Sequence, residues 1–146
     1  LALIVSEAPA TVAGMFTTNQ VCAAPVKVCV ERVKKKNLAQ VVVVNSGNAN
    51  ACTGDRGMED AWSMVRATAK ALDISELEVM VASTGVIGQY LPIANVLSGI
   101  EQLPELKLRP AGSAGLTEQV PIAPPLEVTL WVAIAVFLVA VRLAGE

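Results

Sequence analysis

Apolar residues along the chain follow two patterns, short β-branched runs and longer stretches with three- and four-residue spacing. The short runs predict strands at residues 2–6, 11–17, 41–44 and 79–82, with a turn at Ala8-Pro9 joining the first two. The longer stretches predict helices at residues 26–36, 55–72 and 92–102. This order of strands and helices predicts an α/β fold, with layers of helix on sheet.

The predicted helices each have an apolar side that can pack on such a sheet. In the first helix this side is formed by Val26, Cys29, Val30 and Val33. The lysines at residues 34–36 suit the negative end of the helix dipole, so we interpret them as a solvated helix end rather than a binding patch. Trp62 belongs to the apolar stripe of the second helix and is expected in the core. The four valines at 41–44 and the apolar run Val-Met-Val-Ala at 79–82, together called the valine strands below, are expected to be buried central strands.

The last forty residues differ from the rest of the chain, and we place a boundary near residues 103–107. Residues 1–106 hold 18 of the 24 charges, whereas residues 107–146 are rich in Pro, Gly and Ala and then become continuously apolar from 128 to 141 apart from Thr129. As a helix that apolar segment would span roughly 21 Å, which is short for a hydrocarbon core of about 30 Å. The expected organisation is therefore a folded part, 1–106, and a tail, 107–146.

Composition narrows the possible functions. The chain is 53% hydrophobic with a net charge of −2, which excludes a disordered chain and does not favour nucleic-acid binding. It contains no histidine, which excludes Ser-His and Cys-His nucleophile pairs and metal sites that need histidine. Cys22, Cys29 and Cys52 lack a Cys-x-x-Cys spacing and are expected to be reduced thiols. No export leader precedes the first strand, so we expect a cytoplasmic protein, and a start at Leu1 suggests a piece of something longer.

Candidate chemistry follows the two valine strands. Residues 45–54 are dense in Asn and Gly, which fits a ligand-binding loop and a tight connection equally well. In the second loop, Thr84 and Gly85 offer a hydroxyl beside an unhindered backbone N–H, the donor pair that a developing oxyanion needs. A phosphate-binding turn through Gly85 and Gly88 is the alternative, although the Gly-x-Gly-x-x-Gly spacing is missing. The residues alone supply no activated nucleophile: Leu1 is not an N-terminal threonine, and the helical lysines Lys27 and Lys70 have no reason to be buried.

Several segments resemble one family of enzymes. Residues 1–26 (LALIVSEAPATVAGMFTTNQVCAAPV), 41–57 (VVVVNSGNANACTGDRG) and 79–92 (VMVASTGVIGQYLP), with the helix between the last two, resemble the bifunctional ornithine acetyltransferase / N-acetylglutamate synthase family of arginine biosynthesis. The resemblance implies the layered α/β fold of that family, of which only the N-terminal, α-chain portion is present. It implies acetyl transfer from N-acetylornithine to glutamate, with acetyl-CoA as a possible co-substrate and no bound cofactor. It also implies partners, namely the β chain that self-cleavage before a threonine releases from the same precursor, and oligomers of α and β chains.

The resemblance places the family's oxyanion hole on Thr84 and Gly85, the same pair that the residues suggest. It also shows what is missing. The family's nucleophile lies in an Ala-Thr-Met-Leu context, but the two Ala-Thr pairs of this chain, at Thr11 and Thr68, are not followed by Met-Leu. The resemblance stops near Glu101, so we expect an inactive fragment whose tail results from a frameshift. The alternative is a small non-enzymatic protein whose apolar segment at 128–141 binds a membrane or a partner.

Overall fold

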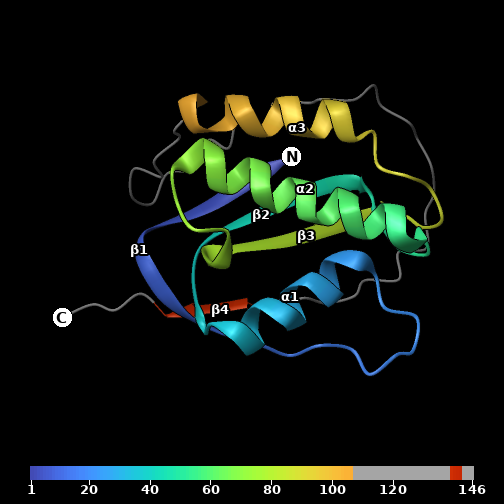
Figure 1. Ribbon diagram of the computed structural model, residues 1–146, viewed down its shortest axis with the longest axis horizontal. Helices are drawn as coiled ribbons and strands as arrows, with labels where there is room; N and C mark the ends of the chain where they lie inside the picture. Colours follow the sequence, from blue (N-terminus) through green and yellow to red (C-terminus); the bar gives the residue numbers. More distant parts are fainter. Residues whose placement is uncertain (107–138, 143–146) are drawn as a thin grey trace, which may run out of the picture.

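The computed structural model describes residues 1–106 and the backbone of residues 139–142. In chain order the elements are β1 (Ala2–Gly14), α1 (Ala24–Lys35), β2 (Leu38–Asn48), α2 (Gly54–Leu72), a 3₁₀ turn η1 (Glu76–Glu78), β3 (Val79–Val86), α3 (Ile93–Gln102), a second 3₁₀ turn η2 (Leu103–Leu106) and β4 (Val139–Arg142). The sheet has the strand order β3-β2-β1-β4, with β2 and β3 parallel and the other neighbours antiparallel. Helices α1 and α2 pack against β3 and each other, and α3 packs on α2 (Figure 1). The predicted layered α/β architecture is confirmed.

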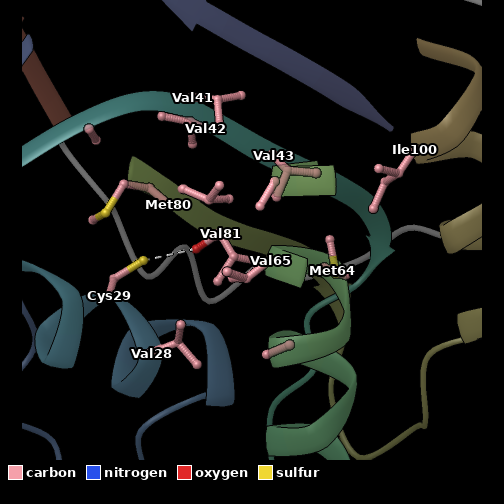
Figure 2. Close-up of a cluster of buried hydrophobic side chains, with 14 of the residues drawn as sticks. Val28, Cys29, Val41, Val42, Val43, Met64, Val65, Met80, Val81 and Ile100 are labelled. Carbon is pink, nitrogen blue, oxygen red and sulfur yellow. Dashed lines mark hydrogen bonds between the residues drawn. The ribbon is translucent and has the colours of Figure 1, made fainter. Parts of the chain in front are cut away.

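The core lies between the parallel strands and the helices. Val41, Val43, Val79 and Val81 are almost completely buried, as the near-continuous apolar runs of parallel strands require. Figure 2 shows Val81 beside side chains from α1 and α2. The helix residues that are completely buried in this core cluster are Val28, Cys29, Ala61, Met64, Val65 and Ile100. Each such apolar side chain contributes about 1.5–3 kcal/mol by leaving water, so the parallel pair β2–β3 with its helices forms the stable centre of the molecule.

The N-terminal segment forms one strand, so the predicted turn at Ala8-Pro9 is wrong. Strand β1 runs antiparallel to β2 along its length, but the register shifts between Val5, which faces Val41, and Ala10, which faces Ala39. Pro9 falls in this irregular stretch, where a residue without an N–H removes no ladder hydrogen bond. Proline therefore interrupts the pairing without reversing the chain, and the strand ends at Gly14 rather than continuing to residue 17.

Both valine strands extend further than their apolar runs. Strand β2 continues to Asn48 and β3 to Val86, and the added residues pair with one another in parallel register. The loops expected directly after residues 44 and 82 therefore begin as strand. The expectation that both strands are central is confirmed for β2 and wrong for β3, which lies at the edge of the described sheet.

The buried face of helix α1 shares Cys29 with the predicted one, but it is shifted toward residues that the prediction left out. Its most buried residues are Ala24, Pro25, Val28, Cys29 and Arg32. The Arg32 guanidinium stacks on the Trp62 ring at 4.7 Å and lies 3.8 Å from the Glu76 carboxylate, which lets a charged residue occupy the buried face. Trp62 itself is partly buried against the core, as expected. Two of the three lysines at the helix end form ion pairs, Lys35 with Glu31 and Lys36 with Glu78 at 2.8 Å, and the interpretation as a helix end is consistent with these contacts.

The apolar tail segment at residues 128–141 lies outside the described residues except at its end. Residues 139–141 belong to β4, which pairs antiparallel with β1, so a helix does not run through the whole segment. In the described ranges, no helix combines the length and apolarity needed to cross a membrane.

Candidate functional site

The candidate site lies where the parallel strands β2 and β3 end. Ser46 faces Thr84 in the register, and the preceding pair is Asn45 with Ser83. Because successive strand residues point to opposite faces, these two pairs lie on opposite sides of the sheet. Asn45 is buried, whereas Ser46 and Thr84 are exposed. Thr84 therefore presents its hydroxyl on an open face near the carboxyl ends of two parallel strands, a common position for sites in α/β sheets.

Gly85, the residue after Thr84, sits where the two backbones approach closely. Its φ is +131°, in the region that favours glycine. A Cβ added at Gly85 would lie 2.2 Å from the carbonyl carbon of Gly47 and 2.5 Å from the backbone nitrogen of Asn48. No side chain fits against backbone atoms that close. The glycine is thus required by the packing of β3 on β2, and the adjacent threonine is held on a rigid element.

Within the described part of the chain the Thr84 hydroxyl has no hydrogen-bond partner. A hydroxyl on a fixed strand can donate to a ligand oxygen without first breaking a protein hydrogen bond. Gly88 differs, because its N–H donates to the carbonyl of Ala51 at 2.8 Å. The phosphate-binding turn considered above would need that N–H, so this hydrogen bond counts against it.

The asparagines of residues 45–50 are used to hold the connection between β2 and α2. Asn48 Nδ2 donates to the carbonyls of Gln89 and Tyr90, at 3.0 and 3.1 Å, and thereby ties this connection to the one after β3. Asn50 is fully buried: its Nδ2 donates to the Gly57 carbonyl, and its Oδ1 accepts from Thr53 Oγ1, both at 2.8 Å. Of the two interpretations left open for this loop, the hydrogen bonds favour the tight connection, which braces the strand ends.

A cavity of about 300 Å³ opens at the same end of the sheet, and Thr84 and Gly85 are not part of its lining. It lies between residues 20–22, which precede α1, and residues 52–55, which lead into α2. A hydrogen bond from the Ala24 N–H to the Asn50 carbonyl, 3.2 Å long, brings the two segments together. Sequence reasoning did not find this cavity, because the two segments are about thirty residues apart and no periodic pattern links them.

The fold shifts the pKa of three described groups, all of them on α1 and α2. Burial raises the pKa of the Cys29 thiol to about 11, against smaller lowering effects of the Val81 backbone and of the Arg32 charge. Burial also raises the pKa of Asp60, against the attraction of Arg56, and lowers that of Arg32. Lys27 and Lys70 are exposed, as expected. A general base for the strand ends is therefore not apparent among the described residues, nor is a group of three side chains suited to a metal ion.

The three cysteines are free thiols in the structure, in agreement with the sequence-based prediction. Cys29 is completely buried, Cys22 is half-buried and Cys52 is exposed. The three thiols therefore differ in solvent exposure, a difference that their spacing in the sequence does not indicate.

Comparison with known proteins gives one consistent result. The ArgJ family model matches residues 1–129. The arginine biosynthesis bifunctional protein ArgJ of Caldanaerobacter subterraneus is 57% identical over 101 residues, which cover 69% of this chain and 25% of that protein. The ArgJ protein of Geobacter sulfurreducens is 55% identical over 103 residues, covering 70% of this chain and 26% of that protein. The chain thus spans about a quarter of the length of these curated relatives.

Solved structures agree with the sequence matches. The crystal structure of the arginine biosynthesis bifunctional protein ArgJ from Bacillus halodurans superposes with a TM-score of 0.67 at 47% identity, over 68% of this chain and 52% of that one. The crystal structure of ornithine acetyltransferase complexed with ornithine from Mycobacterium tuberculosis gives 0.64 at 39% identity, over 68% and 54%. At 47% and 39% identity, both structures resemble this chain in sequence as well as in fold.

Proposed function

The chain belongs to the ArgJ family, and on that premise we propose that it is the N-terminal part of an acetyltransferase of arginine biosynthesis, in which Thr84 and Gly85 form the oxyanion hole. The reaction is the transfer of acetyl from N-acetylornithine, or from acetyl-CoA, to glutamate. The observation that carries the proposal is the exposed Thr84 hydroxyl, which has no hydrogen-bond partner among the described residues and lies beside a glycine packed closely on β2, in a chain that matches this family.

The proposed role follows from the chemistry of acyl transfer. When a nucleophile attacks the acetyl carbonyl, the carbonyl oxygen takes up negative charge, and donors already aimed at that position stabilise the transition state. The Thr84 O–H and the Gly85 N–H come from adjacent residues on one strand. The close contact of Gly85 with Gly47 supports a fixed geometry for both donors. Loss of one such donor typically lowers kcat about 100- to 1000-fold.

The nucleophile is proposed to come from the part of the enzyme that follows this chain. Of the two threonines preceded by alanine, Thr68 is fully buried and donates to the Met64 carbonyl at 2.8 Å. Thr11 lies inside β1, paired with Leu38. The nucleophile must reach an acetyl group and must become the N-terminal residue of a chain after cleavage, and neither threonine is placed for this. We therefore propose that this chain alone does not transfer acetyl groups, and that its partner is the remainder of the precursor.

The proposal places the enzyme in the cytoplasm and includes a missing partner, and one feature of the structure supports each of these two points. Three free thiols fit a reducing compartment. Large apolar side chains are exposed on β1 and near the strand ends, among them Ile4, Val5, Ile87 and Tyr90. Exposed apolar surface of this kind is typical of an interface. Oligomers of α and β chains, as in the family resemblance, are part of the same proposal.

The test is a chimera in which residues 1–106 replace the matching first quarter of the ArgJ protein of Geobacter sulfurreducens. We expect this chimera to transfer acetyl from N-acetylornithine to glutamate, whereas the purified 146-residue chain does not. Thr84→Ala should lower kcat of the chimera about 100- to 1000-fold, and Thr84→Ser should restore most of it. Thr11→Ala, at an exposed position on β1, is the matched control and should leave kcat unchanged.

Two outcomes would contradict the proposal. Acetyl transfer by the 146-residue chain alone would show that it holds its own nucleophile. An active chimera whose kcat is unchanged by Thr84→Ala would remove Thr84 from the site, while the family membership would stand.

A further inference from the structure

Two of the three thiols face the same cavity. Cys22 and Cys52 both line the space of about 300 Å³ between the segment before α1 and the segment before α2. Cys22 is half-buried and Cys52 is exposed, so both can be reached from solvent. Cys29 is completely enclosed in the core, and its sulfur is hydrogen-bonded to the Val81 carbonyl at 3.1 Å. The fold therefore separates one inert thiol from two accessible thiols that share a cavity.

We propose that Cys22 and Cys52 form a paired-thiol modification site, which a hydroperoxide oxidises to an intrachain disulfide. The proposal does not depend on the acetyltransferase assignment. The sequence spacing of the two cysteines does not indicate a pair, whereas the cavity does.

The two sides of the cavity are held by different sets of hydrogen bonds. On the Cys52 side, the Ala51 carbonyl accepts from Gly88, and the buried Asn50 is hydrogen-bonded to Gly57 and Thr53. On the Cys22 side, the side-chain hydrogen bonds from Thr17 to Cys22 stay within the segment. These include the bond from Cys22 Sγ to the Asn19 carbonyl, 2.8 Å long. The Ala24 N–H donates to the Asn50 carbonyl at 3.2 Å and so holds the two segments beside one another, and a disulfide requires the Cα atoms of the two cysteines to lie within about 7 Å.

The chemistry balances with one hydroperoxide as the oxidant. The thiolate of Cys52, the more exposed of the two, attacks the peroxide oxygen; the O–O bond breaks, leaving a sulfenic acid on Cys52 and releasing water or an alcohol. The thiolate of Cys22 then attacks that sulfur and expels hydroxide, which takes up a proton to become water. The two thiols lose two electrons and two protons in all, and the peroxide is reduced.

Such a disulfide would tie the entry of α1 to the entry of α2, close to the candidate site. Cys52 is next to Ala51, whose carbonyl accepts from Gly88, and Gly88 follows Gly85 by three residues. The state of the thiols is therefore connected to the end of β3 through one backbone hydrogen bond.

The experiment treats the purified 146-residue chain with hydrogen peroxide at low protein concentration, blocks the remaining thiols, and maps disulfides by mass spectrometry without reduction. We expect a linked pair of peptides containing Cys22 and Cys52, formed at a rate independent of protein concentration, while Cys29 stays reduced. Cys22→Ser and Cys52→Ser should each abolish this product, and Cys29→Ala, the matched control, should leave it unchanged.

Three results would overturn the proposal. The first is oxidation of Cys52 to sulfinic acid with Cys22 still reduced, which would show that the thiols do not meet. The second is a disulfide that forms only between chains, at a rate rising with protein concentration. The third is equal yield of the Cys22–Cys52 product in denaturant, which would show that the folded cavity does not bring the thiols together.

Discussion

Gly85→Ala tests the close approach of β2 and β3 on which the candidate site rests. The new Cβ would lie 2.2 Å from the Gly47 carbonyl carbon, 2.5 Å from the Asn48 nitrogen and 2.6 Å from the Gly47 oxygen. All three atoms belong to the backbone of a paired strand, so they cannot give way as the end of a flexible side chain could. The φ of +131° adds a second cost, because an L-residue rarely adopts it.

The expected loss of stability combines these two contributions. A backbone conformation of this kind costs about 1–3 kcal/mol, and forced overpacking costs about 1–3 kcal/mol more. Together they predict a loss of about 2–6 kcal/mol, a large part of the 5–15 kcal/mol typical of a whole domain. The free energy of unfolding is measured by urea denaturation, followed by circular dichroism and by tryptophan fluorescence.

Gly88→Ala is the matched control for this prediction. Gly88 also has a positive φ, +78°, but a Cβ there meets nothing within 4 Å. It should lose only the conformational part, about 1–2 kcal/mol. If the two variants unfold at the same urea concentration with the same slope, the close backbone contact at Gly85 is not present and the argument for a rigid strand end fails.

Two further predictions concern buried polar and titratable groups. Asn50→Ala removes the hydrogen bonds to Gly57 and Thr53 and should lower the free energy of unfolding by about 2–4 kcal/mol, whereas Asn95→Ala, at an exposed position on α3, should change it by less than about 0.5 kcal/mol in the same urea titration. Burial raises the pKa of the folded Cys29 thiol from 9.0 to about 11, so the folded state holds this proton more tightly than the unfolded state does. The free energy of unfolding is therefore unaffected by this group below pH 9 and falls by ~2–3 kcal/mol as the pH rises from 9 to 11. Cys29→Ala should show a shallower pH dependence of unfolding over that range, and an identical pH dependence would contradict the buried thiol.

Much of the fold could be predicted because its signals are local. The stripe of α2 repeats with the period of a helix, and the short apolar runs of β2 and β3 are typical of buried strands, so the α/β class and the approximate place of these elements along the chain follow from neighbouring residues. The Thr84-Gly85 pair was also found locally, since a hydroxyl beside a glycine is visible in the chain. That it serves as an oxyanion hole stays a prediction, and so does the boundary near residues 103–107.

Other features depended on partners distant in the chain. The single strand β1 could not be told from two strands, because Pro9 is a turn signal until β2 is seen to pair on both sides of it. The buried face of α1 includes Arg32, which local hydrophobicity assigns to solvent, and it is buried only because Trp62 and Glu76 lie beside it. A local hydrophobicity pattern contains no information about such distant partners, so it cannot predict that a charged residue lies on the buried face of α1.

By itself, the sequence determined the α/β class, the order and centres of the main elements, the absence of histidine chemistry and the resemblance to one family. These features depend on residue type and on short-range periodicity, and both can be read directly from the sequence. Only the tertiary structure decided where β2 and β3 end, why Gly85 must be a glycine, and that Cys22 and Cys52 share a cavity while Cys29 is sealed in the core. These depend on which distant backbones come within contact distance, and that is set by packing of the whole molecule rather than by any local stretch of it.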